Sequence, residues 1–184
     1  MGQRTGTLVS YIDDKGQKHN KVYYNQWGIG RVQLNAIMGC FLSQIGKEGL
    51  DLEGSNSMRL ENVAADMNEA DFTDIKQVAN ILHQMDNNNG GVVIFFDERE
   101  KRGNGKIGFI LGYEECEHYD EVKEEYVQDE KPFSRFVPFD EWATKVGNPF
   151  VDDVYKAMFR AFCEHFGFTI INDKPITKGG QQWD

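Results

Sequence analysis

The sequence has little of what a disulfide-stabilised or membrane-spanning protein needs. It contains three cysteines, Cys40, Cys116 and Cys163, an odd and widely spaced set that indicates reduced thiols. No apolar run reaches the ~18 residues of a membrane span. Residues 1–16 show neither a signal-peptide nor a transit-peptide pattern. These absences predict a cytoplasmic protein.

Motifs for nucleophilic catalysis and phosphate binding are also scarce. There is no G-x-S-x-G elbow and no P-loop pattern, and the chain has only four histidines. Residues 103–108 do match G-x-G-x-x-G, but a dinucleotide site requires a helix to open at those glycines. Residues 106–111 resemble a strand instead. We therefore interpret the glycines as part of a hairpin turn and expect no cofactor.

Two Cys-Glu-His triplets, at 116–118 and 163–165, supply the ligand types of a zinc site. Their spacing argues against one. Cys163 and His165 lie two residues apart on a predicted helix, about 200° around its axis, so they are poorly placed to share an ion. We expect buried cysteines, exposed histidines and no metal.

Three carboxylates, Asp97, Glu98 and Glu100, follow a predicted buried strand, a place where acids often serve as bases or metal ligands. Basic residues alternate with them, which favours a solvated hairpin tip. A small hydrolase or nucleotide-binding enzyme that uses these three carboxylates remains the alternative class.

The composition supports a folded core. The chain has 184 residues, of which 40% are hydrophobic and 13 are Phe. We expect a single domain over residues 1–173 and a flexible C-terminal tail over 174–184.

Turn residues and periodicity predict the first half of the fold. Residues 7–12 and 21–24 are β-prone and flank the turn 13–16, which indicates an N-terminal hairpin. A helical period begins at Arg31 and ends near Gly46. Residues 47–70 are expected to form a loop or short strands.

The second half mixes helices and strands. Asp71 is the expected N-cap of a helix that reaches Met85. We predict strands at 92–96, buried on both faces, at 106–111, its antiparallel partner, and at 133–137 and 168–171. Helices are predicted at 138–146 and at 151–166, the latter closed by Gly167. The absence of a regular βαβ alternation favours an α+β fold. We expect a mainly antiparallel sheet with an N-terminal hairpin and three main amphipathic helices.

The most distinctive feature is a dense run of acidic residues at 114–130. It holds nine acidic residues and one lysine, whereas the whole chain has a net charge of -10. The acidic residues are Glu114, Glu115, Glu117, Asp120, Glu121, Glu124, Glu125, Asp129 and Glu130.

Two interpretations of this acidic run stay open. It is either a solvated, flexible face or a docking surface for a basic protein. In the second case the carboxylates stand in for phosphates, and Tyr119 and Tyr126 add contact area. A second candidate surface surrounds Tyr23, Tyr24 and Trp27, where Trp27 either plugs the core or forms an exposed hot spot.

The N-terminal segment resembles a known set of proteins. Met1-Gly2-Gln3-Arg4, a hairpin and then Tyr24-Asn25-Gln26-Trp27-Gly28 are similar to small phage and prophage proteins that open Met-Gly-Thr-Arg and continue to a Tyr-x-x-Trp-like motif. The resemblance covers roughly the first 30 residues, and Gln3 departs from the usual Thr. It implies an origin in a phage or mobile element but carries over no residue roles.

Charge and implied origin lead to one functional hypothesis. The chain is expected to be a non-enzymatic inhibitor of anti-CRISPR type in the host cytoplasm. It would block a basic nucleic-acid-binding protein, such as Cas9 or another CRISPR effector, without binding nucleic acid or a membrane itself. Apart from the small enzyme above, the other alternative is a phage structural or morphogenesis protein.

Overall fold

We describe the fold from a computed structural model, which defines residues 4–43, 59–60, 69–85, 88–100, 104–146 and 151–173. The helices in this part of the chain are α1 (Arg31–Ser43), α2 (Ile75–Gln84), α3 (Phe139–Lys145) and α4 (Asp153–Phe166). The strands are β1 (Arg4–Ile12), β2 (Lys18–Gln26), β3 (Arg59–Leu60), β4 (Gly91–Asp97), β5 (Gly105–Ile110), β6 (Glu117–Asp120), β7 (Glu125–Gln128) and β8 (Phe168–Ile170).

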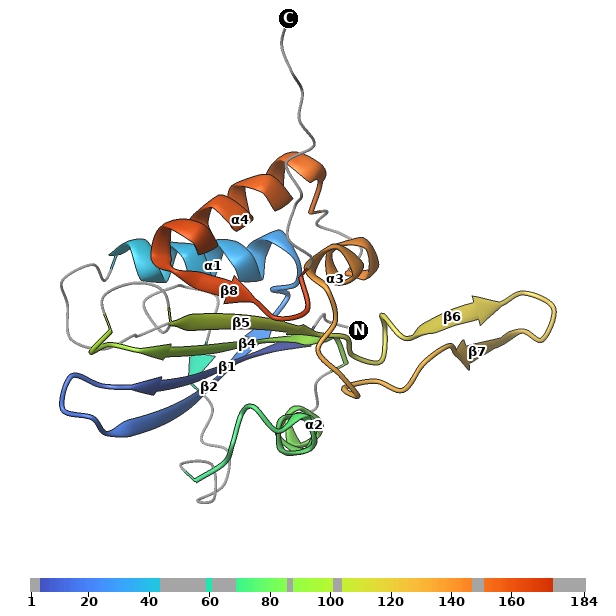
Figure 1. The fold of residues 1–184 in the computed structure, drawn as a ribbon. Coiled ribbons are helices and arrows are strands. Elements are labelled where there is room, and N and C mark those ends of the chain that lie inside the picture. The colour runs from blue at the N-terminus through green and yellow to red at the C-terminus, as the bar shows by residue number, and fades with distance from the viewer. Residues whose placement is uncertain are drawn as a thin grey trace, which may run out of the picture.

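Six strands form one sheet in the order β3-β2-β1-β4-β5-β8, and β6 and β7 form a separate hairpin. Helices α1, α3 and α4 lie on one face of the sheet, and α2 lies on the other (Figure 1). The β1–β4 and β5–β8 pairs are parallel, and the other pairs are antiparallel. The predicted α+β class with a mainly antiparallel sheet is confirmed.

The N-terminal hairpin and the helix after it agree with the sequence pattern. β1 and β2 pair over their full lengths, from Arg4 opposite Gln26 to Ile12 opposite Lys18. In the turn, the Asp13 carboxylate accepts hydrogen bonds from backbone N–H groups, and Gly16 has a φ of 83°, which glycine adopts without strain. Helix α1 then begins at Arg31 as predicted.

The central strand pair also agrees. β4 pairs antiparallel with β5, and Val92, Val93 and Ile94 are fully buried between the two helical layers. The last three residues of β4 are only half-buried, so burial on both faces ends before Phe95. The parallel neighbour of β4, strand β1, was not predicted, because sequence periodicity gives no strand order.

Two predictions in this region are wrong. Helix α2 is capped by Asp74, whose carboxylate accepts a hydrogen bond from Lys76 N at 2.9 Å, whereas Asp71 closes a tight turn through Thr73. Residues 133–137 are not a strand. Only Val137 bridges to β5, at Phe109, because Phe133 adopts a left-handed φ of 53° and breaks the extended run.

An aromatic cluster forms the larger of two cores. The ring of Phe109 on β5 packs against Phe139 and Trp142 of α3, each at a centroid distance of 4.8 Å, and against Phe159 of α4 at 6.0 Å. This contact anchors both helices to the sheet. Gly167 has a φ of 74° and ends α4, as predicted.

Not every apolar position of α4 is buried. Val154 and Met158 belong to its predicted apolar stripe, yet both are exposed. The second core lies beneath α2 and includes Val78, Leu82 and Phe133. Within the described ranges, no helix has the length and apolar character needed to cross a membrane.

Some predictions fall outside the described residues. These are the end of the first helix near Gly46, most of the segment 47–70 and the tail 174–184. The single-domain boundary at residue 173 therefore stays a prediction.

Candidate protein-interaction site

The acidic run forms a β-hairpin that projects from the body of the protein. β6 and β7 pair antiparallel, with Tyr119 opposite Tyr126 and Asp120 opposite Glu125. Figure 1 shows this hairpin extending sideways, beyond the ends of the strands of the main sheet and away from all four helices. We call residues 117–128 the acidic arm. It has regular structure, which the sequence pattern did not reveal.

The tip of the acidic arm is ordered by the side chain of Asp120. Its carboxylate accepts hydrogen bonds from Val122 N at 2.9 Å and Lys123 N at 3.2 Å, and Lys123 Nζ lies 3.7 Å from it. Val122, at the apex, is 94% exposed. An apolar side chain is therefore held at the most remote point of the acidic arm.

The two faces of the acidic arm differ in chemistry because side chains alternate along a strand. One face carries Tyr119 and Tyr126, whose rings meet edge to face at 5.3 Å and are 51% and 73% exposed. The other face places Asp120 directly opposite Glu125. Two like charges in this position destabilise a strand pair, and an isolated hairpin is only marginally stable in water. The acidic arm therefore depends on contacts at its base.

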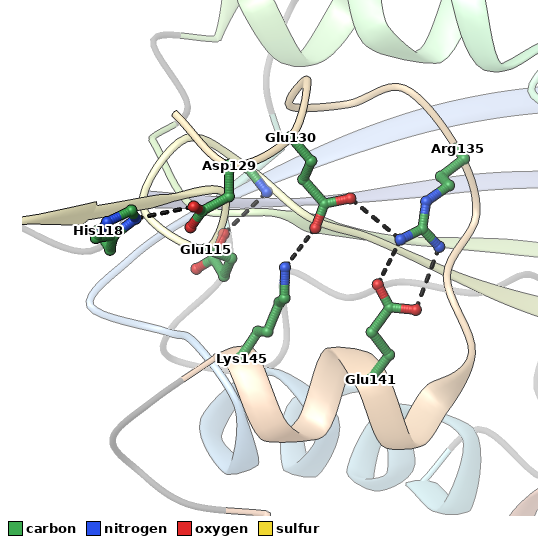
Figure 2. A network of polar contacts seen from close by, with 8 residues as sticks. Glu115, His118, Asp129, Glu130, Arg135, Glu141 and Lys145 are labelled. Carbon is green, nitrogen blue, oxygen red and sulfur yellow. Dashed lines mark hydrogen bonds and ion pairs between the residues drawn. The ribbon is translucent and has the colours of Figure 1, made fainter. Parts of the chain in front are cut away.

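An ion-pair network provides that base (Figure 2). Glu130 lies between Lys145, with which it forms a close ion pair, and Arg135, at 3.1 Å. Arg135 also pairs with Glu141 at 2.5 Å, and Lys145 and Glu141 both belong to α3. Hydrogen bonds from Lys145 and Arg135 lower the pKa of Glu130. The network fastens the end of the acidic run to α3.

Backbone and side-chain contacts also join the start of β6 to the residues that follow β7. Asp129 N donates to the carbonyl of Cys116 at 2.8 Å, and the Asp129 carboxylate contacts His118 Nδ1 at the same distance. Cys116 is buried, and burial raises the pKa of its thiol to about 11. The neutral thiol packs into the core and anchors the start of the acidic arm.

Glu115 is a buried carboxylate, although the sequence placed it on the contact surface. It is 7% exposed, accepts hydrogen bonds from Asn89 Nδ2 at 2.8 Å, and accepts from Gly90 N and Gly112 N at 2.9 Å. Burial raises its pKa. Glu115 therefore joins the loop before β4 to the segment after β5, and it is excluded from any exposed surface.

The remaining predicted contact residues divide by their surroundings. Glu114 is exposed and bonds to Asn88 and Asn89, and Asp129 and Glu130 belong to the base. The acidic arm itself carries the other seven, of which Asp120 is engaged at the turn and the rest are left for a partner: Glu117, Tyr119, Asp120, Glu121, Glu124, Glu125 and Tyr126.

Sequence reasoning missed Val122 at the apex and the supporting pair Arg135 and Lys145. The β-prone residues Tyr119 and Tyr126, on either side of a charged turn, were the available signal for the hairpin.

The carboxylates after β4 lie at the opposite end of the sheet. Asp97 forms an ion pair with Arg99 at 2.6 Å, and this hydrogen bond lowers the pKa of Asp97. Burial and the nearby Asp14 and Asp13 raise the pKa of Glu98. The structure thus brings Glu98 close to the β1–β2 turn, while the charge of Asp97 is balanced by Arg99, two residues further along the chain.

The cysteine triplets and the glycine motif have structural roles. Cys116 and Cys163 are buried while His118 and His165 are exposed, as predicted. No three His, Cys, Asp or Glu side chains in the described ranges are grouped to hold a metal ion. Gly105 begins strand β5, not a helix, and a Cβ there would lie 2.2 Å from the ring of Phe168. Glycine is therefore needed at position 105 so that the ring of Phe168 can pack against the backbone of β5.

Trp27 does not plug the core. It is 63% exposed and has a φ of 73°, a left-handed conformation that costs a tryptophan about 1 kcal/mol. It lies between β2 and α1, whereas Tyr23 on β2 is buried. Trp27 is thus available as an exposed aromatic contact, separate from the acidic arm in the sequence.

Comparisons of the chain with family models, with curated proteins and with solved structures found no match.

Proposed function

We propose that this protein is a non-enzymatic inhibitor that binds another protein through its acidic arm. The arm would occupy a basic nucleic-acid-binding groove, with its carboxylates in the positions of phosphates. The observation that carries the proposal is the projecting hairpin, in which solvent-facing carboxylates surround an exposed aromatic pair.

The charge distribution supports a basic protein partner. Glu121, Glu124 and Glu125 are exposed and, in the described part of the chain, form no salt bridge. A dense group of free carboxylates speeds encounter with a positively charged surface and repels nucleic acid. A chain with a net charge of -10 gains no counterion release from DNA.

The shape of the acidic arm supports insertion into a groove. The base is fastened to α3 through Glu130, and the β6–β7 hairpin projects away from the body of the protein. Because the arm is already ordered by these contacts, a partner would not need to fold it, which lowers the entropic cost of binding.

In its most specific form, the proposal is an anti-CRISPR-type inhibitor from a phage or mobile element, acting in the host cytoplasm on an effector such as Cas9. The resemblance of the N-terminal segment to phage proteins and the phosphate-like charge support this form. The residue-level proposal concerns the acidic arm and holds for any basic nucleic-acid-binding partner.

The test is competition with duplex DNA for a Cas9–guide RNA complex. The arm variant carries Glu121→Gln, Glu124→Gln and Glu125→Gln. Its matched control, which removes equal charge from exposed sites elsewhere, carries Gln at Glu69, Glu100 and Glu164. We expect the wild type and the control to displace DNA equally, and the arm variant to be weaker by at least ~10-fold, a difference of about 1.4 kcal/mol.

Two results would count against the proposal in different ways. If the wild type does not compete with DNA, Cas9 is not the partner. The proposal of another basic nucleic-acid-binding partner then stands only if DNA displaces the host proteins that the wild type captures. If the arm variant and the control behave alike, the acidic arm is a solvated face and not a binding surface.

A further inference from the structure

The aromatic face of the acidic arm has the chemistry of an arginine-binding surface. Tyr119 and Tyr126 expose their rings on one face, and by strand alternation Glu117 and Gln128 lie on the same face. Two residues along a strand span about 7 Å, so Glu117 is within reach of a cation stacked on the tyrosine beside it. The face thus combines aromatic rings with a carboxylate.

Two sites within the protein show that an aromatic ring next to a carboxylate can bind an arginine side chain. The Arg31 guanidinium lies 5.2 Å from the centre of the Tyr155 ring and pairs with Asp152. Arg160 lies 5.1 Å from the Phe139 ring and pairs with Asp140, the next residue along, at 3.2 Å. In both places one guanidinium contacts a ring and a carboxylate at once.

The rings of the acidic arm have no such occupant in the described part of the chain. The three cation–ring contacts there involve Tyr11, Tyr155 and Phe139. Lys123, the one basic residue of the arm, is directed to Asp120 at the turn. The aromatic pair is therefore available to a cation from another molecule.

We propose that Tyr119 and Tyr126, with Glu117, bind an arginine side chain of the partner protein, and that the partner segment is arginine-rich and not lysine-rich. Arginine is favoured because its flat guanidinium can stack on an aromatic ring and at the same time donate hydrogen bonds to a carboxylate beside that ring. A lysine ammonium is compact and strongly hydrated, and it cannot do both equally well. This inference rests on the proposed function, since it specifies the partner chemistry of the same acidic arm.

The test measures binding of two fluorescent peptides of equal length, one of alternating arginine and glycine and the other of alternating lysine and glycine. Anisotropy at ~150 mM salt keeps long-range attraction screened. We expect the wild type to prefer the arginine peptide by about fivefold or more, since each exposed cation–ring contact contributes a few-fold. Tyr119→Phe with Tyr126→Phe retains both rings and should retain the preference.

A second double variant, Tyr119→Ile with Tyr126→Ile, keeps β-propensity and an apolar cross-strand contact but has no ring. We expect it to bind both peptides weakly and equally. Equal affinity of the wild type for the two peptides, a preference that survives in the isoleucine variant, or no binding of either peptide would each overturn the inference.

The arm variant with Gln at Glu121, Glu124 and Glu125 separates this inference from the proposed function. If charge draws basic proteins to the arm, this variant should bind both peptides more weakly and keep the ratio between them. A weakened arm variant together with a wild type that shows no arginine preference refutes the arginine site alone. An arm variant of unchanged affinity refutes the proposed function.

Discussion

Replacement of Glu115 by alanine tests whether the buried carboxylate anchors the start of the acidic arm. The substitution removes the acceptor of three hydrogen bonds, from Asn89 Nδ2, Gly90 N and Gly112 N. The surrounding backbone is tightly packed, since a Cβ on Gly90 would lie 1.8 Å from the carbonyl oxygen of Ile110. The chain therefore has little freedom to rearrange around the lost carboxylate.

The size of the effect follows from the stranded donors. Each buried donor left without an acceptor costs about 1–3 kcal/mol. Asn89 Nδ2 keeps the carboxylate of Glu114 as an acceptor, whereas the bonds from Gly90 N and Gly112 N to Glu115 are lost. The substitution also relieves the burial that raises the pKa of Glu115, and water can enter the space. We expect a net decrease in the free energy of unfolding of about 3 kcal/mol.

Urea denaturation followed by circular dichroism measures this change, and Glu114→Ala is the matched control. Glu114 is the neighbouring carboxylate and also bonds to Asn88 and Asn89, but it is exposed. Its replacement should cost within ~0.5 kcal/mol. If Glu115→Ala is as mild as Glu114→Ala, the buried carboxylate is not an anchor, and the reasoning from its hydrogen bonds is wrong.

Three further predictions concern the base, the sheet and the loop before α1. Hydrogen bonds lower the pKa of Glu130 from 4.5, so its ion pairs should stabilise the protein above pH 4.5 and lose this effect as the pH falls through the folded-state pKa. In melting temperatures measured between ~pH 3 and ~pH 6, Glu130→Gln should therefore show a smaller fall at the acidic end than the wild type. Gly105→Ala should lower the free energy of unfolding in urea by about 2 kcal/mol, because its Cβ would meet a buried phenylalanine ring at 2.2 Å; an unchanged value would contradict the packing argument. Trp27→Gly should not lower stability, since glycine adopts the left-handed conformation freely, whereas Trp142→Ala in the core should cost about 4 kcal/mol; equal losses in calorimetry would show that Trp27 is a core residue.

Several parts of the fold could be predicted from local sequence because local chemistry controls them. The N-terminal hairpin depends on the turn at Asp13 and Gly16, and the end of α4 depends on Gly167 in a left-handed conformation. The buried strand at Val92 was recognisable from its continuous apolar run. These signals lie within a few residues of the elements that they specify.

Other predictions failed where a local signal competed with a distant one. Asp71 and Asp74 are both good caps by type, and only the path of the chain into α2 selects Asp74. Val154 and Met158 fit an apolar stripe, yet they are exposed, whereas Tyr155, Phe159 and Phe162 of the same helix are buried. In both cases the residue type suits the predicted role, but contacts with distant parts of the chain decide which residue takes that role.

The sequence by itself determined most of the element types, the α+β class and the existence of a strongly acidic run, because periodicity, turn chemistry and composition are local properties. Only the tertiary structure decided how the acidic residues divide. Glu115 is buried because donors from Asn89 and Gly112 converge on it, and Glu130 is turned toward Lys145 of α3. Glu117, Asp120, Glu121, Glu124 and Glu125 are left on the projecting hairpin because no opposite charge from elsewhere in the described chain reaches them. Residues of one type in one run differ through partners such as Asn89 and Lys145, which are distant in the sequence and are brought near by folding.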